Sequence, residues 1–588
     1  MSAHLVALAA ALGAWSMWAV SVPVLVGMAL LAVWRRHVAL IVLVVFVAVG
    51  TRGAGELDAL DPPQADAFSG WVTLLDDPRP LGAVGVIATV RHDDRRISAV
   101  AHGAVAARFD DALAGERLLL SGRIAPVGAE DDFDRWRHVV GRLTVDSVDG
   151  REPGSPVFRF ANTVRRTLVG GAESLSRGDR AVFLGMVIGD DRGQTAVVAD
   201  DFRAAGLGHL LVVSGQNVAF VLAVVAPFAG RFRPAFRALW LFATLLLFAV
   251  ITRFEPSVMR AVAMAGTGIG ASVMGTPVDG KRALSCAVAG LLLIDPFLVR
   301  LVAFQLSVAA TAGIVWWSGP LAQRLGGPSW LRVPVATTAA AQLAVSPVLL
   351  GLFGPLPLAS LPANFLAGPV SGAVMVWGCT GGMLAGLLGG VAAEIVHVPS
   401  TVMLWWIGGV ASRAALGPQA TLGVVSILML GSAALLAVSR IRSAAVVAGV
   451  MAALVAVAAL MAAPSLGPGE HPLVGESRAF VSEGGDLVLV LDNPPTRGLI
   501  ESLRRSGGGR PDLVVALDGD RSDAEAVLAL RERFGTLAVA APPMHRVPGG
   551  RTVQAGQTVE FDDLLVRFER VAPRLQLSVK HRLPEHLM

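Results

Sequence analysis

Two blocks of apolar residues dominate the chain, and a stretch of different periodicity separates them. The first block has apolar segments near residues 4–20, 22–34 and 38–50, and the second covers roughly residues 208–463. Long runs with few charges are typical of transmembrane helices. The pattern therefore predicts a polytopic α-helical membrane protein. The predicted spans of the second block lie near 208–230, 236–251, 256–274, 282–294, 297–318, 332–354, 358–390, 395–416, 419–438 and 443–463. Four prolines in 355–390 indicate a broken or re-entrant helix there.

Residues 64–150 have the short alternating runs of a β domain. The runs GWVTLL, GVIATV, ISAVAH, RLLLSGRI and GRLTVDSV are separated by Gly, Pro and Asp. This spacing predicts a small all-β domain, a barrel of about five strands. Residues 155–207, which follow it, are predicted to form amphipathic helices on or near the membrane surface.

The C-terminal region, residues 470–588, has the pattern of a soluble α/β domain. Strands are predicted at 486–491, 512–517 and 536–541, alternating with helices at 496–506 and 522–534. The chain thus divides into N-terminal helices (1–52), a β domain (64–150), amphipathic helices (155–207), a multi-span membrane domain (208–463) and this last domain.

Composition and charge support the membrane assignment and give it an orientation. Of the 588 residues, 54% are hydrophobic and 16% are charged, whereas soluble proteins carry about 25% charged residues. Positive residues accumulate in cytoplasmic loops. An orientation with the N-terminus and these loops in the cytoplasm places the β domain and the C-terminal domain outside. The basic residues concerned are Arg35, Arg36, Arg231, Arg233, Arg237, Lys281, Arg282, Arg324, Arg440 and Arg442.

Polar residues interrupt the apolar pattern at the start of the second block, in GLGHLLVVSGQN (206–217). Read as a helix from Gly208, this segment would bring His209, Gln216 and Asn217 to one face, with Ser214 close to the bilayer centre. Gly215 would either break the helix or allow a neighbour to approach. Two interpretations stay open: a polar lining for a passage, or hydrogen bonds that hold the helices together.

Further polar residues are predicted at a similar depth on other helices: Arg260, Gln305, Gln342 and Asn364. Arg260 comes one turn into its helix, so its side chain could also extend to the interface. Amides and a guanidinium on several helices favour a hydrophilic route across the membrane.

GLGHLLVVSGQNVAF resembles the GLxHLLAxSG signature of the ComEC family, the membrane channels of competence DNA uptake. PSVMRAVAM (256–264), DPFLVRLVAFQLSVAATAGI (295–314) and the segment 341–369 resemble further family blocks in the same order. The family layout has N-terminal helices, an extracytoplasmic OB-like β-barrel domain, the competence membrane domain and a metallo-β-lactamase-like C-terminal domain. The chain departs from this pattern at Asn217, where many relatives carry His.

The resemblance implies a channel in the cytoplasmic membrane that transports single-stranded DNA into the cell. It implies a DNA receptor with a helix–hairpin–helix domain and a cytosolic helicase-like ATPase as partners, in addition to the lipid bilayer. Gln, Asn, His and Arg suit this cargo because they donate to phosphate oxygens without base preference. Two alternatives are a membrane-coupled extracytoplasmic nuclease, and a transporter of another substrate derived from the uptake machinery.

The C-terminal domain lacks the metal ligands that the resemblance would lead one to expect. Metallo-β-lactamase-like nucleases carry HxHxDH after a strand, and two metals there activate water. At the corresponding positions this chain has Asp518, Asp520, Ser522 and Asp523. An acidic turn that caps a helix explains these residues better than a magnesium or manganese site. We therefore expect a degenerate domain without metal, cofactor or catalytic activity.

One apparent nucleotide motif is excluded by its context. GTPVDGKR (275–282) fits GxxxxGK, but Arg282 stands where a phosphate loop has Ser or Thr, and no strand–loop–helix unit surrounds it. Energy for transport is therefore expected from a partner or from the proton gradient.

Overall fold

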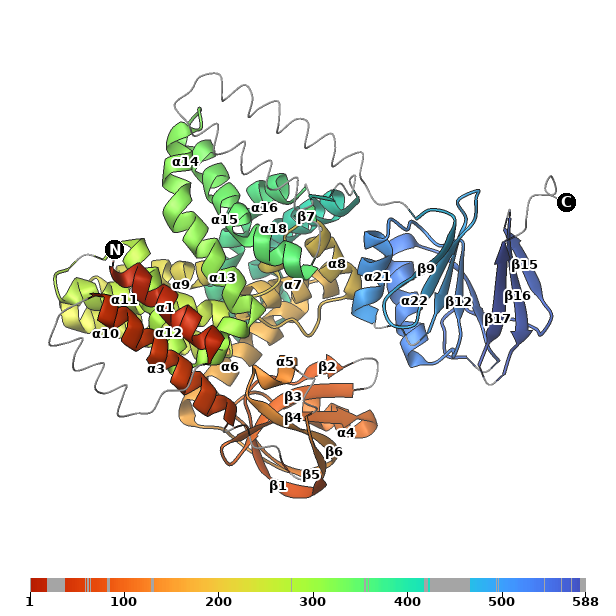
Figure 1. The fold of residues 1–588 in the computed structure, drawn as a ribbon, viewed down its shortest axis with the longest axis horizontal. Coiled ribbons are helices and arrows are strands. Elements are labelled where there is room, and N and C mark those ends of the chain that lie inside the picture. Colours follow the sequence, from red (N-terminus) through yellow and green to blue (C-terminus); the bar gives the residue numbers. More distant parts are fainter. Residues whose placement is uncertain are drawn as a thin grey trace.

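The fold is described from a computed structural model of the chain. It describes residues 2–17, 38–58, 60, 63, 65–81, 85–127, 132–276, 278–353, 356–357, 359–416, 421–422, 466–492, 494, 496–543, 545–561, 563–572 and 574–581. The predicted spans at 22–34 and 443–463 lie outside these residues, and so does the span at 419–438 apart from residues 421–422. Figure 1 shows a helical body with the β domain below it and the C-terminal domain to its right.

The β domain has strands where the period-two runs predicted them, because alternate residues point into a common core. Leu118, Leu120 and Leu143 are fully buried in that core. The elements are β1 (Asp66–Leu74), β2 (Arg79–Leu81), β3 (Gly85–His92), β4 (Arg95–His102), α4 (Gly103–Asp110), β5 (Arg117–Pro126), α5 (Asp132–Arg135) and β6 (Val139–Glu152).

The strand pairings of this domain return to their starting point. The order is β1-β5-β6-β4-β3-β2, and β1 also pairs with β3. Neighbours are antiparallel except β4 and β6, which run parallel with Leu143 opposite Ala99. The helix α4 connects β4 to β5.

The helical body comprises two N-terminal helices and the helices of the membrane domain. Of the described residues, five helical stretches have the length and apolar character to cross a membrane, and two shorter apolar helices accompany them. A multi-pass helical membrane protein is therefore confirmed. The helices are α1 (Ser2–Ser16), α3 (Val38–Asp58), α6 (Pro156–Gly171), α7 (Arg177–Ile188), α8 (Ala196–Ala204), α9 (Gly215–Ala229), α10 (Pro234–Ile251), α11 (Pro256–Val273), α12 (Gly280–Ile294), α13 (Val302–Gly313), α14 (Gly319–Arg324), α15 (Ser329–Phe353), α16 (Ser360–Trp377), α17 (Met383–Leu388) and α18 (Gly390–Leu416).

The structure corrects the sequence prediction at two places in this domain. The helix expected from Gly208 begins only at Gly215, and Gly208–Leu210 forms a single 3₁₀ turn. The helix expected to be broken or re-entrant within 355–390 is continuous over Ser360–Leu388, where a π turn at Gly378–Gly382 joins α16 to α17. Pro369 lies inside α16 without ending it.

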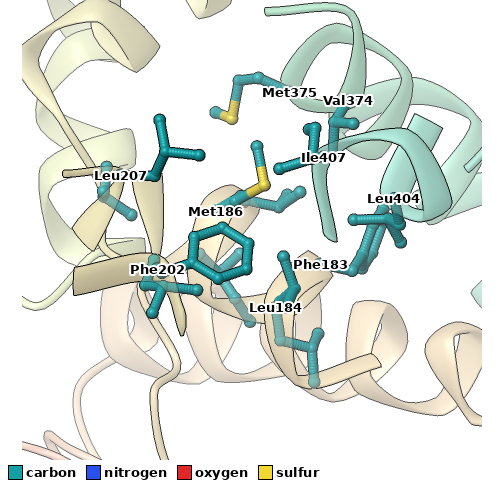
Figure 2. Packing of buried hydrophobic residues seen from close by; sticks show 14 of the residues in the cluster. Phe183, Leu184, Met186, Phe202, Leu207, Val374, Met375, Leu404 and Ile407 are labelled. Atoms are coloured by element: carbon teal, nitrogen blue, oxygen red, sulfur yellow. The ribbon is translucent and has the colours of Figure 1, made fainter. Parts of the chain in front are cut away.

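The amphipathic prediction for 155–207 holds for α6 but is wrong for α7. Every residue from Ala181 to Ile188 is buried. Figure 2 shows why: Phe183, Leu184 and Met186 of α7 pack among side chains from α16 and α18. The helix is apolar all round in its second half because neighbours surround it.

The C-terminal domain is layered. A sheet of order β14-β13-β12-β11-β10-β9 carries helices on one face and a sheet of order β15-β16-β17 on the other. The predicted strands and helices of this domain are confirmed, and β11, β12 and β13 pair in parallel. The elements are β9 (Gly469–Pro472), β10 (Arg478–Val481), β11 (Leu487–Leu491), α21 (Thr496–Arg505), β12 (Leu513–Ala516), α22 (Arg521–Phe534), β13 (Ala538–Ala541), β14 (Arg551–Thr552), β15 (Thr558–Phe561), β16 (Leu564–Arg570) and β17 (Gln576–His581).

A buried ionic network fastens the β domain to the membrane domain. Asp77, 6% exposed, lies 2.9 Å from Nη2 of Arg165 on α6 and 2.9 Å from Nη2 of Arg253 after α10. It also accepts the backbone N–H of Ala114 at 2.8 Å. Arg165 donates to the carbonyl oxygens at the ends of α7 and α10. These contacts fix the β domain at the same ends of several helices.

A second joint fastens the C-terminal domain to α8. Asp200, 1% exposed, lies 3.1 Å from Nη2 of Arg504 on α21. Asp201 pairs with Arg533 of α22, and Thr195 donates to Glu532 at 3.1 Å. Through α8, which leads directly into residues 206–217, the soluble domain is held beside the polar segment.

Candidate functional site: a cavity among the membrane helices

Residues 206–217 form a compact turn followed by a helix start. Gly206 has φ +69°, which favours glycine, and a Cβ there would lie 2.3 Å from the Cβ of Ser360. The chain then makes its 3₁₀ turn and reaches Ser214, the N-cap residue of α9. No side chain caps this helix. The N–H groups of a helix's first turn place partial positive charge at that end, and here no capping side chain offsets it.

Arg260 of α11 lies against this helix start. A Cβ on Gly215 would be 2.5 Å from its Nη2, so only glycine leaves room for the guanidinium. Arg260 is 7% exposed and donates to Ser307 Oγ at 2.8 Å and to Thr311. Within the described part of the chain, no carboxylate lies within ion-pair distance of it. A buried cation and a helix N-terminus therefore converge without a neutralising anion.

Both groups line a cavity of about 2360 Å³ between α9, α11, α13, α15 and α16. Six of the predicted path residues line it: His209, Ser214, Gln216, Arg260, Gln342 and Asn364. The amide of Asn364 donates to the carbonyl oxygens of Gly206 and Ser360, at 3.3 and 2.7 Å. The bond to Gly206 connects the 206–217 turn to α16 at the cavity wall.

Two predicted path residues do not line this cavity. Asn217 donates through Nδ2 to the carbonyl oxygen of Met186 at 2.8 Å and accepts from Ser214 Oγ at 3.1 Å. It therefore holds α9 to α7. Gln305 donates to the carbonyl oxygen of Val299 at 2.8 Å, which closes the turn before α13. For these two residues, the interhelical and local hydrogen-bonding interpretation describes the observed contacts.

The cavity wall includes residues of the C-terminal domain that sequence reasoning missed. Gly498, Glu501, Arg504 and Arg505 of α21 line it beside Arg203 of α8. Arg203 lies 3.5 Å from Glu501, and Arg505 also pairs with Glu501 at 2.5 Å. The basic last turn of α21 was visible in the sequence, but its position depends on contacts about 300 residues apart.

The acidic turn of the C-terminal domain is occupied by structural contacts. Asp520 is the N-cap of α22 and accepts the N–H of Asp523 at 2.9 Å. Asp523 in turn accepts the N–H groups of Asp518 and Gly519, at 3.2 and 2.8 Å. Burial, helped by the nearby Asp520 charge, raises the pKa of Asp523 to about 7. Ser522 donates to the carbonyl oxygen of Pro494 at 2.9 Å.

Comparison with known proteins identifies the family of the membrane domain. Residues 186–463, which contain the whole cavity-lining set of the membrane helices, match the family model described as "Competence protein". The membrane domain is a competence domain of the ComEC family. The resemblance seen in the sequence is therefore confirmed, and the competence domain starts within α7, before the polar turn.

Two curated relatives are similar to the competence domain and its surroundings. The chain is 24% identical over 273 residues to "ComE operon protein 3" of Bacillus subtilis (strain 168), covering 44% of this chain and 34% of the relative. It is 25% identical over 207 residues to "Uncharacterized protein YcaI" of Escherichia coli (strain K12), covering 32% of this chain and 27% of the relative. The matches thus span about a third or less of each relative. No solved structure matches the chain.

Proposed function

We propose that this protein is a channel that moves single-stranded DNA through the cytoplasmic membrane during natural transformation. The observation that carries the proposal is the convergence of Arg260 and the uncapped start of α9 on one large cavity of the competence domain. A helix N-terminus and a guanidinium both favour phosphate. An unpaired cation in a membrane is costly and is typical of a functional site.

The rest of the cavity suits a polymer rather than one small ligand. Amides and hydroxyls contributed by α13, α15 and α16 supply hydrogen bonds with no requirement for a particular base. At its mouth, the three guanidinium groups of Arg203, Arg504 and Arg505 outnumber the carboxylates of Glu501 and Asp200 by one, which gives net positive charge. Such a mouth attracts a polyanion and raises its local concentration.

The orientation proposed from the sequence has support in the helix ends. The basic residues Lys281 and Arg282 lie in the first turn of α12, whereas Asp295 at its other end contacts His138 of the β domain. A cytoplasmic location of the basic end puts the β domain outside. The C-terminal domain is held to α8, before the polar start of α9, and we place it on the outer side as well.

We infer that the β domain is OB-like. Its support is the circuit of pairings β1-β5-β6-β4-β3-β1, with one parallel pair and a helix between the third and fourth long strands. OB-like domains hold single strands by basic grooves and aromatic stacking. Arg117 over the ring of Trp71 is one such basic and aromatic surface.

We further propose that the C-terminal domain is a metallo-β-lactamase-like fold without catalytic activity. The proposed lack of activity is supported by the structural use of two aspartates and by the missing histidines. Asp520 is the N-cap of α22, and Asp523 accepts the N–H groups of Asp518 and Gly519. Transport would then depend on partners: a receptor with a helix–hairpin–helix domain that delivers DNA, and a cytosolic helicase-like ATPase that pulls it. A nuclease activity of the purified chain with added Mn²⁺, lost in Asp518→Ala, would contradict the assignment.

The channel is tested by uptake of labelled DNA in a deletion strain that carries the wild-type chain or Arg260→Gln. We expect Arg260→Gln to lower uptake at least tenfold at unchanged membrane abundance, because the buried positive charge is lost. Arg413→Gln is the matched control, since Arg413 is an exposed arginine on α18 that does not line the cavity. Uptake that persists in the deletion strain would reject the channel and favour a transporter of another substrate.

A further inference from the structure

Three side chains from separate parts of the chain meet where the β domain touches the membrane helices. Glu56 comes from the end of α3, His138 from the turn before β6, and Asp295 from the end of α12. One ligand atom from each lies within 4.8 Å of the others. Among the described residues, no other group of three His, Cys, Asp or Glu side chains converges in this way.

The geometry leaves one carboxylate without a hydrogen bond from the imidazole. Nε2 of His138 lies 3.2 Å from Oδ1 of Asp295 and 3.9 Å from Oε2 of Glu56. A neutral imidazole carries at most one proton on this nitrogen. It therefore satisfies Asp295, and the Glu56 oxygen is left facing the same nitrogen without a donor between them.

These distances are close to those that a bound metal ion imposes. An ion with ligands at about 2.1 Å keeps neighbouring ligand atoms roughly 3.0–3.4 Å apart, in octahedral or tetrahedral geometry. The pair of His138 and Asp295 already has that spacing. The Glu56 oxygen lies 3.9 Å from the imidazole nitrogen and within 4.8 Å of the Asp295 oxygen, so a rotation of its side chain toward both groups supplies the third ligand. Imidazole with two carboxylates is a donor set for zinc or a similar first-row divalent ion.

The surroundings hold these ligands in place and leave the site accessible. The ring of His138 stacks on Phe297, with centroids 4.5 Å apart, and Phe297 is fully buried. The N–H of Phe297 donates to Oδ1 of Asp295 at 3.0 Å. The three side chains remain 20–27% exposed, so an ion and its water ligands can reach them. Arg52 pairs with the other oxygen, Oε1, of Glu56 and leaves Oε2 free for the ion.

We propose that Glu56, His138 and Asp295 form a divalent-cation site, best suited to zinc, that clamps α3, the β domain and the end of α12 together. The ion replaces the single proton that the imidazole shares with Asp295. Among the three side chains themselves, the ion adds ligand bonds where one hydrogen bond, between His138 and Asp295, is present now. The site is independent of the cavity and of the transport proposal.

The test uses the full-length protein in detergent after removal of metal with EDTA. Zinc is titrated against a chromophoric chelator, and bound zinc per chain is measured by mass spectrometry. We expect the wild type to bind one zinc ion at this site. His138→Asn, Glu56→Gln and Asp295→Asn should each lower the affinity for that ion at least tenfold. Asp295→Asn keeps an oxygen that accepts from Phe297, so it separates the loss of a ligand from the loss of the turn.

One control variant and a second readout, the thermal midpoint, complete the test. Glu152→Gln removes an exposed carboxylate of β6 that pairs with Arg117, and it should bind zinc as the wild type does. Zinc should raise the thermal midpoint of the wild type and of Glu152→Gln, but not that of the three ligand variants. Equal zinc binding by the wild type and His138→Asn, or no binding to the wild type, would overturn the proposal.

Discussion

Replacing Asp77 by asparagine should loosen the joint between the β domain and the membrane domain. Burial alone would raise the pKa of Asp77, but Arg165 and Arg253 outweigh it and lower the pKa from 3.8 to about 2. Each pKa unit corresponds to ~1.4 kcal/mol of preference for the charged form, so the carboxylate charge contributes ~2 kcal/mol to the joint. Asparagine keeps the shape and an acceptor oxygen, and removes that charge.

The local assay is hydrogen exchange at Ala114, whose N–H donates to Oδ1 of Asp77. A chain of several domains does not unfold as one unit, so a local probe is better than a global midpoint. A loss of ~2 kcal/mol predicts roughly thirtyfold faster exchange in Asp77→Asn. Asp77→Ala should cost more, about 3–5 kcal/mol, because two buried guanidinium groups then lose the carboxylate that they share.

The stability of the same joint should depend on pH in one direction only. The pKa of Asp77 is lower in the folded chain than in the unfolded one, so its stabilisation is complete above pH 3.8 and is lost as pH falls through about 2. Protection of Ala114 in Asp77→Asn should be flat over this range. Asp146→Asn, at an exposed position of β6, is the control. Unchanged exchange in Asp77→Asn would refute the assigned role of the charge.

Three further outcomes are expected. The pKa of Asp523, raised to about 7 chiefly by burial, predicts that the local stability of α22 falls by ~1 kcal/mol per pH unit from about pH 4 to 7. Asp523→Asn should flatten this slope in hydrogen exchange, and a slope that persists would contradict it. Gly215→Ala should lower DNA uptake at normal abundance by displacing the guanidinium beside it, whereas Gly270→Ala, in open space, should not; equal uptake by both variants would count against the close approach. In a cysteine-free background, a single cysteine at Gln216 should react with a water-soluble thiol reagent and one at Asn217 should stay protected, since only the first lines the cavity. Equal labelling at both positions would reject that difference.

The fold was readable from the sequence wherever a local periodicity reports burial on one face. The strands of the β domain and of β11–β13 follow such patterns, and so do the apolar membrane helices. The start of α9 was not readable, because the residues before it are apolar enough to continue a helix. In the fold, Gly208–Leu210 makes a separate 3₁₀ turn and the backbone of Ser214 is extended, so α9 begins only at Gly215. The turn is anchored at Gly206, whose left-handed backbone is packed on Ser360, 154 positions later in the chain.

The site was readable as a set of residue types, but the roles of its members were not. Arg260 and Asn217 are both polar residues in apolar segments, and the sequence pattern does not distinguish their roles. In the fold, Arg260 donates to hydroxyl groups and faces the cavity, whereas the amide of Asn217 donates to the carbonyl oxygen of Met186. The contacts of α21 with α8 join residues about 300 positions apart, and no local pattern encodes such a pairing.

The position of α21 means that the cavity is not contained within the membrane domain, because a helix of the C-terminal domain forms part of its wall. A chain shortened before α21 would keep every polar residue of the membrane helices, Arg260 included, yet its cavity would have a wider and less basic mouth. Truncation is thus a change of the cavity itself. The C-terminal domain, which lacks the HxHxDH ligands, contributes one helix to the wall of the cavity between the membrane helices.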